Sequence, residues 1–341
     1  MKTINPPGYG FRQCIGIDVS KNELVACLCM YDPGCGAEFG HPCQTFKNNK
    51  TGLNQLVKWA RKEAYKEFPL LFLMEPTGSY YEDLAHHLNK LRFTVYVVQP
   101  RRVHAFFEEE GFRTKTDYVD ARGLALMGCV KSHMKPWTPP SPVYRQLRFL
   151  TRTATDIKTM RTTLLNQREA ISHSFDPDKE ACRELDSLIK SCDRQLDANE
   201  RKLAELVNSN PEIKKKVGYV ESIVGVGFLS AVTILAETDG FALMTSRKQV
   251  ASFAGLDVKA RQSGSFAGKT HISKAGNVHL RKALYMCAVS ASMHNPQMMD
   301  LYNRMCYRGS EPRAAHTAVM RKLLTLAYTL VKRKELYDRD K

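Results

Sequence analysis

The first 130 residues alternate between short apolar runs and amphipathic stretches. Five runs have the length and apolar content of strands, with a short turn between the first two: 13–20, 23–30, 43–49, 69–76 and 93–100. Apolar residues recur at helical spacing in three further segments: 51–67, 80–91 and most of 101–130. Three strands followed by helix, strand, helix, strand and helix predict an α/β fold, in which a hairpin begins a mixed sheet and helices flank it.

A proline-rich segment separates this region from two long helical patterns. Residues 135–144 contain four prolines in ten, which predicts a linker over 135–142. Beyond it, apolar residues recur at near-heptad spacing on both sides of a break at 174–180: Leu147, Leu150, Ile157, Leu164, Ile171, then Leu185, Ile189, Cys192, Leu196, Leu203 and Leu206. The pattern predicts an antiparallel coiled-coil hairpin over 143–210, suited to a spacer or dimerisation arm.

The remaining region, over 214–335, has a mainly helical pattern. Within 220–238, Gly225 and Gly227 separate two helical segments and allow the backbone to turn tightly. The second helix then presents free N–H groups on which a phosphate can sit, as in helix-hairpin-helix motifs that bind the DNA backbone. The glycines alone equally fit an ordinary turn between helices, and the basic surroundings favour DNA. Another short helix is expected over 247–258, and a polar loop leading into a helix over 259–292.

Net charge narrows the class of partner. The 341 residues carry a formal charge of +16, and residues 218–341 hold +9 of it, with 18 Lys and Arg against 9 Asp and Glu. Such a balance favours a polyanionic partner, with nucleic acid first and an anionic membrane surface second. No apolar run approaches the roughly 20 residues of a spanning helix. The first residues lack the apolar centre of a signal peptide, so we expect a cytoplasmic protein.

Cysteines gather in the segment from the second to the third predicted strand. Cys27, Cys29, Cys35, His41 and Cys43 lie close enough along the chain to suggest zinc. No Cys-x2-Cys pair is present, however, and Cys27 and Cys29 would share one face of a strand. Reduced thiols are the preferred interpretation of all ten cysteines, and whether this cluster binds metal stays open.

Four carboxylates stand where an α/β fold places catalytic groups. Asp18 follows one apolar strand and Glu75 ends another, while Asp117 and Asp120 are one helical turn apart after the last strand. Taken singly, each would more often be a turn residue or a helix cap. Taken together, they predict a site for one or two Mg²⁺ ions and metal-dependent phosphoryl transfer.

Several ordered motifs then point to a family. They are GIDVSK (16–21), MEPTGSY (74–80), VVQPRRVHAF (97–106), RTKTDYVDARGLA (113–125), VGVGFLSAVTILAE (224–237), FAGLDVKARQSGS (253–265) and HISKAGNVHLRKALYMCAV (271–289). From Ile15 to Tyr328 the chain resembles the DEDD-type transposases of insertion-sequence family one-ten. The resemblance implies a RuvC-like domain of ribonuclease H fold over 11–134, the coiled coil, and a C-terminal serine transposase domain over 214–335.

The resemblance also assigns roles to individual residues. It implies that Asp18, Glu75, Asp117 and Asp120 bind Mg²⁺ or Mn²⁺ and that Ser263, within RQSGS, is the nucleophile. Sequence alone does not separate Ser263 from Ser265, and by composition the segment is only a polar Gly/Ser loop. A hydroxyl between small residues approaches a phosphate easily, and nearby cations suit phosphate binding: Arg261, Lys269, Lys274, Arg281 and Lys282.

The partners implied by the resemblance go beyond anything that composition or spacing shows. They are double-stranded donor and target DNA and a structured guide RNA, or bridge RNA, encoded by the element. The resemblance further implies a homo-oligomer, a dimer that becomes a tetramer on DNA, with the acidic and serine halves of a site from different protomers. The protein would then work in the prokaryotic cytoplasm, associated with the nucleoid during recombination.

Three alternatives remain at this stage. A RuvC-like nuclease or junction resolvase would use the same carboxylates with water as the nucleophile. A sugar kinase or actin-like ATPase would share the GIDVSK loop, but we find neither the second phosphate loop nor the adenosine motif of those chains. A non-catalytic DNA-binding scaffold would carry four carboxylates that repel DNA unless a cation neutralises them.

Overall fold

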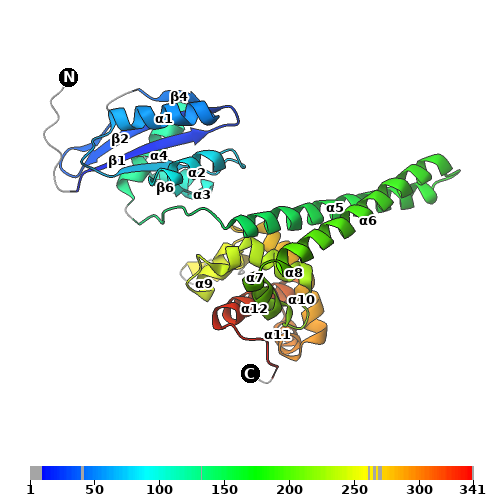
Figure 1. The fold of residues 1–341 in the computed structure, drawn as a ribbon. Coiled ribbons are helices and arrows are strands. Elements are labelled where there is room, and N and C mark those ends of the chain that lie inside the picture. Colours follow the sequence, from blue (N-terminus) through cyan, green and yellow to red (C-terminus); the bar gives the residue numbers. More distant parts are fainter. Residues whose placement is uncertain are drawn as a thin grey trace. The chain divides into compact units, whose positions relative to one another are not determined.

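The computed structural model describes residues 10–39, 42–131, 133–259, 262–263, 266–267 and 271–339. Residues 262–263 and 266–267 are described by their backbone alone. The chain forms two compact units that meet in sequence between Pro139 and Pro140 (Figure 1). This boundary falls inside the proline-rich segment. No helix in the described ranges is both long and apolar enough to cross a membrane.

A mixed sheet forms the centre of the first unit. Its strands are β1 (Arg12–Val19), β2 (Glu23–Asp32), β3 (Gly36–Glu38), β4 (Gln44–Lys47), β5 (Leu70–Met74) and β6 (Thr94–Val97). The order is β3-β2-β1-β5-β6, with β4 also paired to β2. β2 runs antiparallel to β1, β3 and β4, whereas β5 runs parallel to both β1 and β6. These directions are those of the ribonuclease H fold, so the predicted fold class is confirmed.

Helices cover both faces of this sheet. They are α1 (Lys50–Glu63), α2 (Glu82–Lys90), α3 (Pro100–Glu109) and α4 (Asp117–Val130). Ile15 and Ile17 of β1 pack with Leu56 of α1 and Leu84 of α2 on one face. Cys14, which points the other way, packs with residues of α3 and α4. The sheet is therefore buried on both sides, which explains why its strands are continuous apolar runs.

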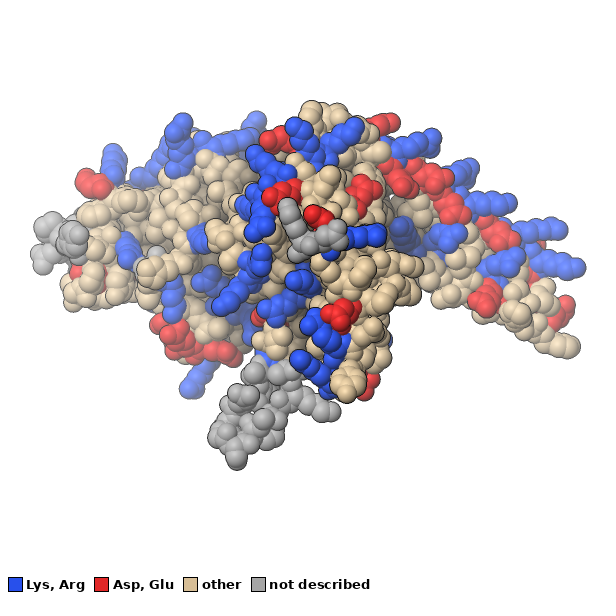
Figure 2. Space-filling view, turned by 90° about the horizontal axis from the view of Figure 1, so that it is seen from below, with Lys and Arg blue, Asp and Glu red and all other residues tan. Residues whose placement is uncertain are grey.

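The predicted hairpin of long helices is present as α5 (Pro142–Ser172) and α6 (Lys179–Asn208). Arg161 pairs with Asp193, and Arg168 Nε lies 2.9 Å from Asp186 Oδ1. Both ion pairs are seven residues apart on each helix, so one antiparallel register extends over a full heptad. Figure 2 shows Lys and Arg side chains interspersed with Asp and Glu side chains along this hairpin, which extends to the right of the view.

The base of the hairpin is part of the second unit. Tyr144 and Leu147 of α5 and Leu203 of α6 are buried in the same core as the C-terminal helices. These helices are α7 (Pro211–Glu221), α8 (Phe228–Glu237), α9 (Arg247–Phe253), α10 (Val278–His294), α11 (Pro296–Tyr307) and α12 (Pro312–Arg333). The hairpin and the mainly helical C-terminal region thus form one compact body instead of two.

A buried ion pair joins three helices of that body. The Glu237 side chain at the end of α8 is 1% exposed and accepts two hydrogen bonds from Arg152 of α5, at 2.7 and 2.9 Å. Asn277, the N-cap of α10, donates to the same carboxylate at 2.7 Å. Burial alone raises the pKa of Glu237, but the Arg152 and Asn277 hydrogen bonds outweigh it and hold that pKa below its usual value.

The polar segment after α9 is not the plain loop that its composition predicts. β7 (Val258–Lys259) pairs antiparallel with β10 (His271–Ile272), and β8 (Gln262–Ser263) pairs antiparallel with β9 (Phe266–Ala267). Each strand has only two residues, which is too short for an alternation of apolar and polar positions to be visible in the sequence.

Candidate active site

Neighbouring parallel strands bring Asp18 and Glu75 together. Gly16 of β1 is opposite Leu73 of β5, and Ile17 is opposite Met74. One step further, at the carboxyl ends of both strands, Asp18 comes opposite Glu75. Paired strands lie about 4.8 Å apart, so the two backbones are close at this edge of the sheet, where ligands of α/β folds bind.

A glycine in β1 lets α4 approach the same edge. A Cβ atom on Gly16 would lie 2.1 Å from the Ala125 nitrogen and 2.2 Å from the Ala121 oxygen, so the helix backbone rests directly on the strand. Further along α4, a Cβ on Gly128 would meet the Cys14 sulfur at 2.1 Å. The helix therefore runs opposite to β1, and its first turn lies beside Asp18. That turn contains Asp117 and Asp120.

The N-cap of α4 fixes where this turn begins. The Thr116 side chain accepts a hydrogen bond from the Val119 nitrogen at 3.2 Å. Such a cap satisfies one of the free N–H groups of the first turn. Residues 110–116 separate α3 from α4 in the segment that the sequence predicts to be mostly helical, and Gly111 there has φ 75°.

The four carboxylates interact electrostatically. Burial, followed by the charges of Asp117, Asp120 and Glu75, raises the pKa of Asp18 to about 6. Burial and the Asp120 charge raise the pKa of Glu75. Burial likewise raises the pKa of Asp120, the Lys115 ammonium opposes this shift, and the Asp117 charge adds to it. The sequence-predicted carboxylates are thus near enough for the charges of Glu75, Asp117 and Asp120 to act on Asp18.

This set fits a divalent cation by donor chemistry. Carboxylate oxygens are the ligands that Mg²⁺ and Mn²⁺ prefer, and a cation would relieve the repulsion that adds to the effect of burial on these pKa values. Within the described ranges, no three His, Cys, Asp or Glu side chains are already close enough to hold a metal ion. The four carboxylates thus lie near one another without converging on one point, with Asp117 exposed and the other three partly buried. Of the cysteine-rich cluster, His41 lies outside the described residues.

A cavity lined by side chains of both charges adjoins the carboxylates. It has a volume of about 710 Å³, and its lining includes Glu75 and Asp120. Exposed charged or titratable side chains of α3 and of the segment before α4 line it as well: Arg101, His104, Glu108, Arg113 and Lys115. Lys115 acts on the carboxylates directly, because its charge opposes the rise in the pKa of both Glu75 and Asp120.

Sequence reasoning did not assign these cavity residues to the site. All except Glu108 are within the motifs VVQPRRVHAF and RTKTDYVDARGLA, so the signal was present as basic residues flanking the strand end and the carboxylate pair. Such a cavity, with cations around two carboxylates, can hold the phosphate backbone of a nucleic acid strand next to a metal.

The candidate residues of the second unit are only partly described. Ser263 belongs to β8 by its backbone, and its side chain lies outside the description. Arg261, Ser265 and Lys269 lie outside the described residues altogether. Lys274 and Lys282 are exposed. Arg281 Nη1 donates to the carbonyls of Ala254 and Gly276 at 2.8 and 2.9 Å, so this guanidinium joins the loop after α9 to the start of α10.

The glycine turn between α7 and α8 is tightly packed. Gly225 has φ 99°, and a Cβ there would lie 2.7 Å from the Ala291 Cα of α10. Gly227 is the exposed N-cap of α8, and no side chain caps that helix start. The turn thus has a packing role at Gly225, and phosphate binding at the uncapped start of α8 stays a prediction.

Comparisons with known proteins agree across the chain. A family described as a DEDD transposase of the IS110 type matches residues 15–177, and the family described as "Transposase IS116/IS110/IS902 family" matches residues 218–303. The chain is 30% identical over 337 residues to the pilin gene-inverting protein of Moraxella bovis, covering 95% of this chain and 97% of that protein. The corresponding protein of Moraxella lacunata shows the same identity and coverage.

Two more distant proteins are also similar. An IS110 protein of Streptomyces coelicolor is 23% identical over 157 residues, or 45% of this chain and 39% of its own length. The RuvC structure of Thermus thermophilus is 13% identical and covers 37% of this chain and all of its own, with a TM-score of 0.30. With two family matches in chain order and a relative aligned over nearly its full length, this chain belongs to the IS110 family of DEDD transposases.

Proposed function

We propose that this chain catalyses site-specific recombination of DNA, with Ser263 as the nucleophile and four carboxylates as metal ligands. Membership of the transposase family makes the chain an enzyme that acts on DNA. The observation that carries the finer proposal is the placing of Asp18, Glu75, Asp117 and Asp120 near one edge of the sheet, where burial and the charges of the other three carboxylates raise the pKa of Asp18.

The chemistry follows from the donors present. When bound there, Mg²⁺ or Mn²⁺ would act as a Lewis acid toward a DNA phosphate. The Ser263 hydroxyl attacks the phosphorus, so that a bond from the serine oxygen to phosphorus forms and the bond from phosphorus to O3′ breaks. The serine proton leaves to solvent, and the released O3′ takes up a proton. Attack by a 3′-hydroxyl on the phosphoserine then reverses the step and joins new ends.

Charge and similarity favour recombination over simple cleavage. The name of the Moraxella relative states that it inverts a gene, and inversion requires cut ends to be rejoined. A phosphoserine link conserves the energy of the broken phosphodiester for that rejoining. Three cations in the cavity beside Glu75 and Asp120 (Arg101, Arg113 and Lys115) support a nucleic acid strand as the substrate at the acidic site.

The proposal includes a structured guide RNA that pairs with donor and target DNA, and a homo-oligomer, dimeric alone and tetrameric on DNA. The charge of +16 suits more than one polyanion. Exposed apolar side chains on the hairpin, Met160 at 60% and Leu188 at 52%, suit contact between copies. Such an enzyme would work in the cytoplasm on the nucleoid.

The direct test is a covalent adduct. Purified protein is incubated with Mg²⁺, the element's DNA ends and the transcribed flanking RNA, then digested and analysed by mass spectrometry. We expect a serine-linked nucleotide on the peptide with Ser263. It should be lost in Ser263→Ala and in Asp18→Asn, and retained in the neighbouring control Ser265→Ala. Recombination by Ser263→Ala at the wild-type rate would show that the nucleophile is assigned wrongly.

A second candidate is a metal-dependent nuclease or junction resolvase that uses water. The observation that favours it is that all four carboxylates belong to the first unit, so metal binding does not require Ser263. Cleavage that survives Ser263→Ala and leaves no adduct would establish this alternative.

A further inference from the structure

The cysteine-rich segment places two cysteines opposite each other. β2 and β4 pair antiparallel, with Ala26 opposite Gln44 at the end of the recorded register. The next step along both strands brings Cys27 opposite Cys43. Opposite residues of antiparallel strands have Cα atoms about 4.5–5.5 Å apart, which falls inside the roughly 4.4–6.8 Å that a disulfide spans.

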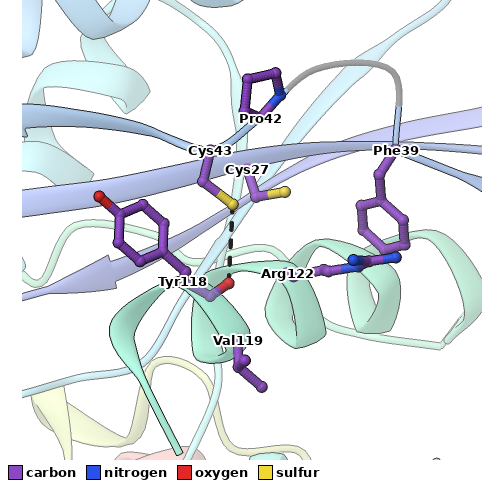
Figure 3. A pocket seen from close by; sticks show the side chains of 7 residues that line it. All are labelled: Cys27, Phe39, Pro42, Cys43, Tyr118, Val119 and Arg122. Atoms are coloured by element: carbon purple, nitrogen blue, oxygen red, sulfur yellow. Dashed lines mark hydrogen bonds between the residues drawn. The ribbon is translucent and has the colours of Figure 1, made fainter.

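Both cysteines line a cavity on the α4 side of the sheet. Its volume is about 460 Å³, and it is lined by Cys27, Phe39, Pro42, Cys43, Tyr118, Val119 and Arg122. Cys27 is 2% exposed and packs with Ala121 of α4, and Cys43, which is partly exposed, packs against the same cluster. Figure 3 shows the two sulfur atoms above the start of α4, with Arg122 stacked on Phe39 beside them.

The two thiols differ in reactivity. Burial, followed by hydrogen bonding with the Cys43 thiol, raises the pKa of Cys27, and the Arg122 charge only partly opposes this. A thiol that resists ionisation is a poor attacking group toward a reagent in solution, so Cys27 is not the thiol that reacts first. Cys43 is the more exposed of the two and opens toward the cavity, so it is the sulfur that a small reagent reaches first.

We propose that Cys27 and Cys43 form a dithiol site that undergoes reversible disulfide exchange with small-molecule disulfides of the glutathione class. The Cys43 thiolate attacks one sulfur of the small disulfide, forming a mixed disulfide and releasing one small thiol. The Cys27 thiol, losing its proton, then attacks the Cys43 sulfur and releases the second. One disulfide is broken and one is formed, so no other oxidant is needed.

Disulfide formation alters a contact with α4. Cys43 Sγ donates a hydrogen bond to the Tyr118 carbonyl at 3.8 Å, and Tyr118 lies between Asp117 and Asp120 in the first turn. A disulfide has no S–H, so this contact is lost when the pair is oxidised. If the carboxylates hold a metal, as the proposed function states, oxidation weakens that binding; this consequence rests on the proposed function, and the dithiol site does not.

The test uses the full chain, reduced and then incubated with oxidised glutathione. Remaining thiols are alkylated and the peptides are mapped by mass spectrometry. We expect a Cys27–Cys43 crosslink that a reductant reverses, its loss in Cys43→Ser, and its retention in the matched control Cys35→Ser, which removes an exposed thiol of the same segment. Phenylarsine oxide, which bridges paired thiols, should bind the wild type and Cys35→Ser but not Cys43→Ser.

The outcomes distinguish the dithiol site from its proposed coupling to metal binding. A stable glutathione adduct on Cys43, a crosslink to Cys35, or no crosslink together with no arsenical binding would each overturn the dithiol site. Mn²⁺ binding is then measured by calorimetry before and after oxidation. Weaker binding in the oxidised wild type, with no change in treated Cys43→Ser, supports the coupling to α4. Unchanged binding in a crosslinked sample contradicts the coupling and leaves the dithiol site standing, whereas no Mn²⁺ binding in the reduced protein contradicts the proposed function instead.

Discussion

At the scale of single residues, Asp18 illustrates how a functional site opposes stability. Its pKa is raised to about 6 by burial and by three neighbouring carboxylates. A carboxyl group whose pKa is higher in the folded than in the unfolded chain destabilises the fold as pH rises from its unfolded value of about 4 through its folded value. Above pH 6, with no cation bound, the ionised Asp18 side chain therefore lowers the free energy of unfolding.

We predict that Asp18→Asn stabilises the metal-free protein at pH 7.5 by about 1 kcal/mol, a value discounted for the partial exposure of the carboxyl group. At pH 3 the gain should nearly disappear, because Asp18 is then mostly protonated in both the folded and the unfolded state. Thermal unfolding followed by circular dichroism at the two pH values measures this, with Mg²⁺ expected to stabilise the wild type more than the variant. A variant less stable than wild type at pH 7.5 would contradict the repulsion.

Lys115 offers a second prediction at this scale. Its ammonium group opposes the rise in the pKa of Glu75 and Asp120. In Lys115→Met both pKa values should rise further, so that the acid limb of the pH dependence of DNA cleavage and of Mn²⁺ binding moves to higher pH. Lys58→Met, an exposed substitution on α1 across the sheet, is the control and should leave both profiles unchanged. Equal pH profiles for Lys115→Met and wild type would show that Lys115 does not act on the carboxylates.

At the scale of elements, the contact between β1 and α4 sets the distance between the carboxylates. In Gly16→Ala the new Cβ meets backbone atoms of α4 at 2.1 and 2.2 Å, which cannot rotate away. We expect a loss of about 2–3 kcal/mol in the free energy of unfolding and weaker Mn²⁺ binding, because α4 must move away from Asp18. Gly218→Ala is the control: a Cβ in the middle of α7 meets nothing within 4 Å, so stability should hold or rise. Urea unfolding distinguishes the two.

Elements differ in how far the sequence predicts them. The five longer strands follow from apolar runs, and the two long helices follow from heptad spacing. In both cases the pattern marks the residues that the fold buries. β3 and the two-residue strands β7 to β10 leave no such period. Asp18 and Glu75 were recognisable because each ends an apolar strand, whereas the pairing of Cys27 with Cys43 depends on the register of β2 and β4, which the short strand β3 separates in sequence. The lining of the cavity beside Glu75 and Asp120 depends in the same way on how α3 and residues 110–116 fold over the strand ends.

At the scale of the whole molecule, charge is unevenly shared between the two units. Residues 1–140 carry 18 Lys and Arg against 14 Asp and Glu, whereas residues 218–341 carry 18 against 9. The first unit also places four carboxylates at the proposed catalytic edge, which repel a phosphate backbone until a cation is bound. Retention of DNA is therefore expected to depend on the second unit, and chemistry on the first.

This division predicts a specific salt dependence for binding of the full-length chain to random-sequence duplex DNA. Each phosphate contact adds about 0.9 to the slope of log affinity against log salt concentration. Removing the exposed cations Lys274 and Lys282 together, as Lys274→Ala/Lys282→Ala, should flatten that slope by nearly 2 and weaken binding at low salt, because each cation releases one counterion. The matched pair Lys58→Ala/Lys62→Ala on α1 loses the same charge from the first unit and should leave the slope unchanged. Fluorescence anisotropy across a salt series measures both, and equal flattening by the two pairs would show that DNA is held by net charge alone, without a surface of the second unit dedicated to it.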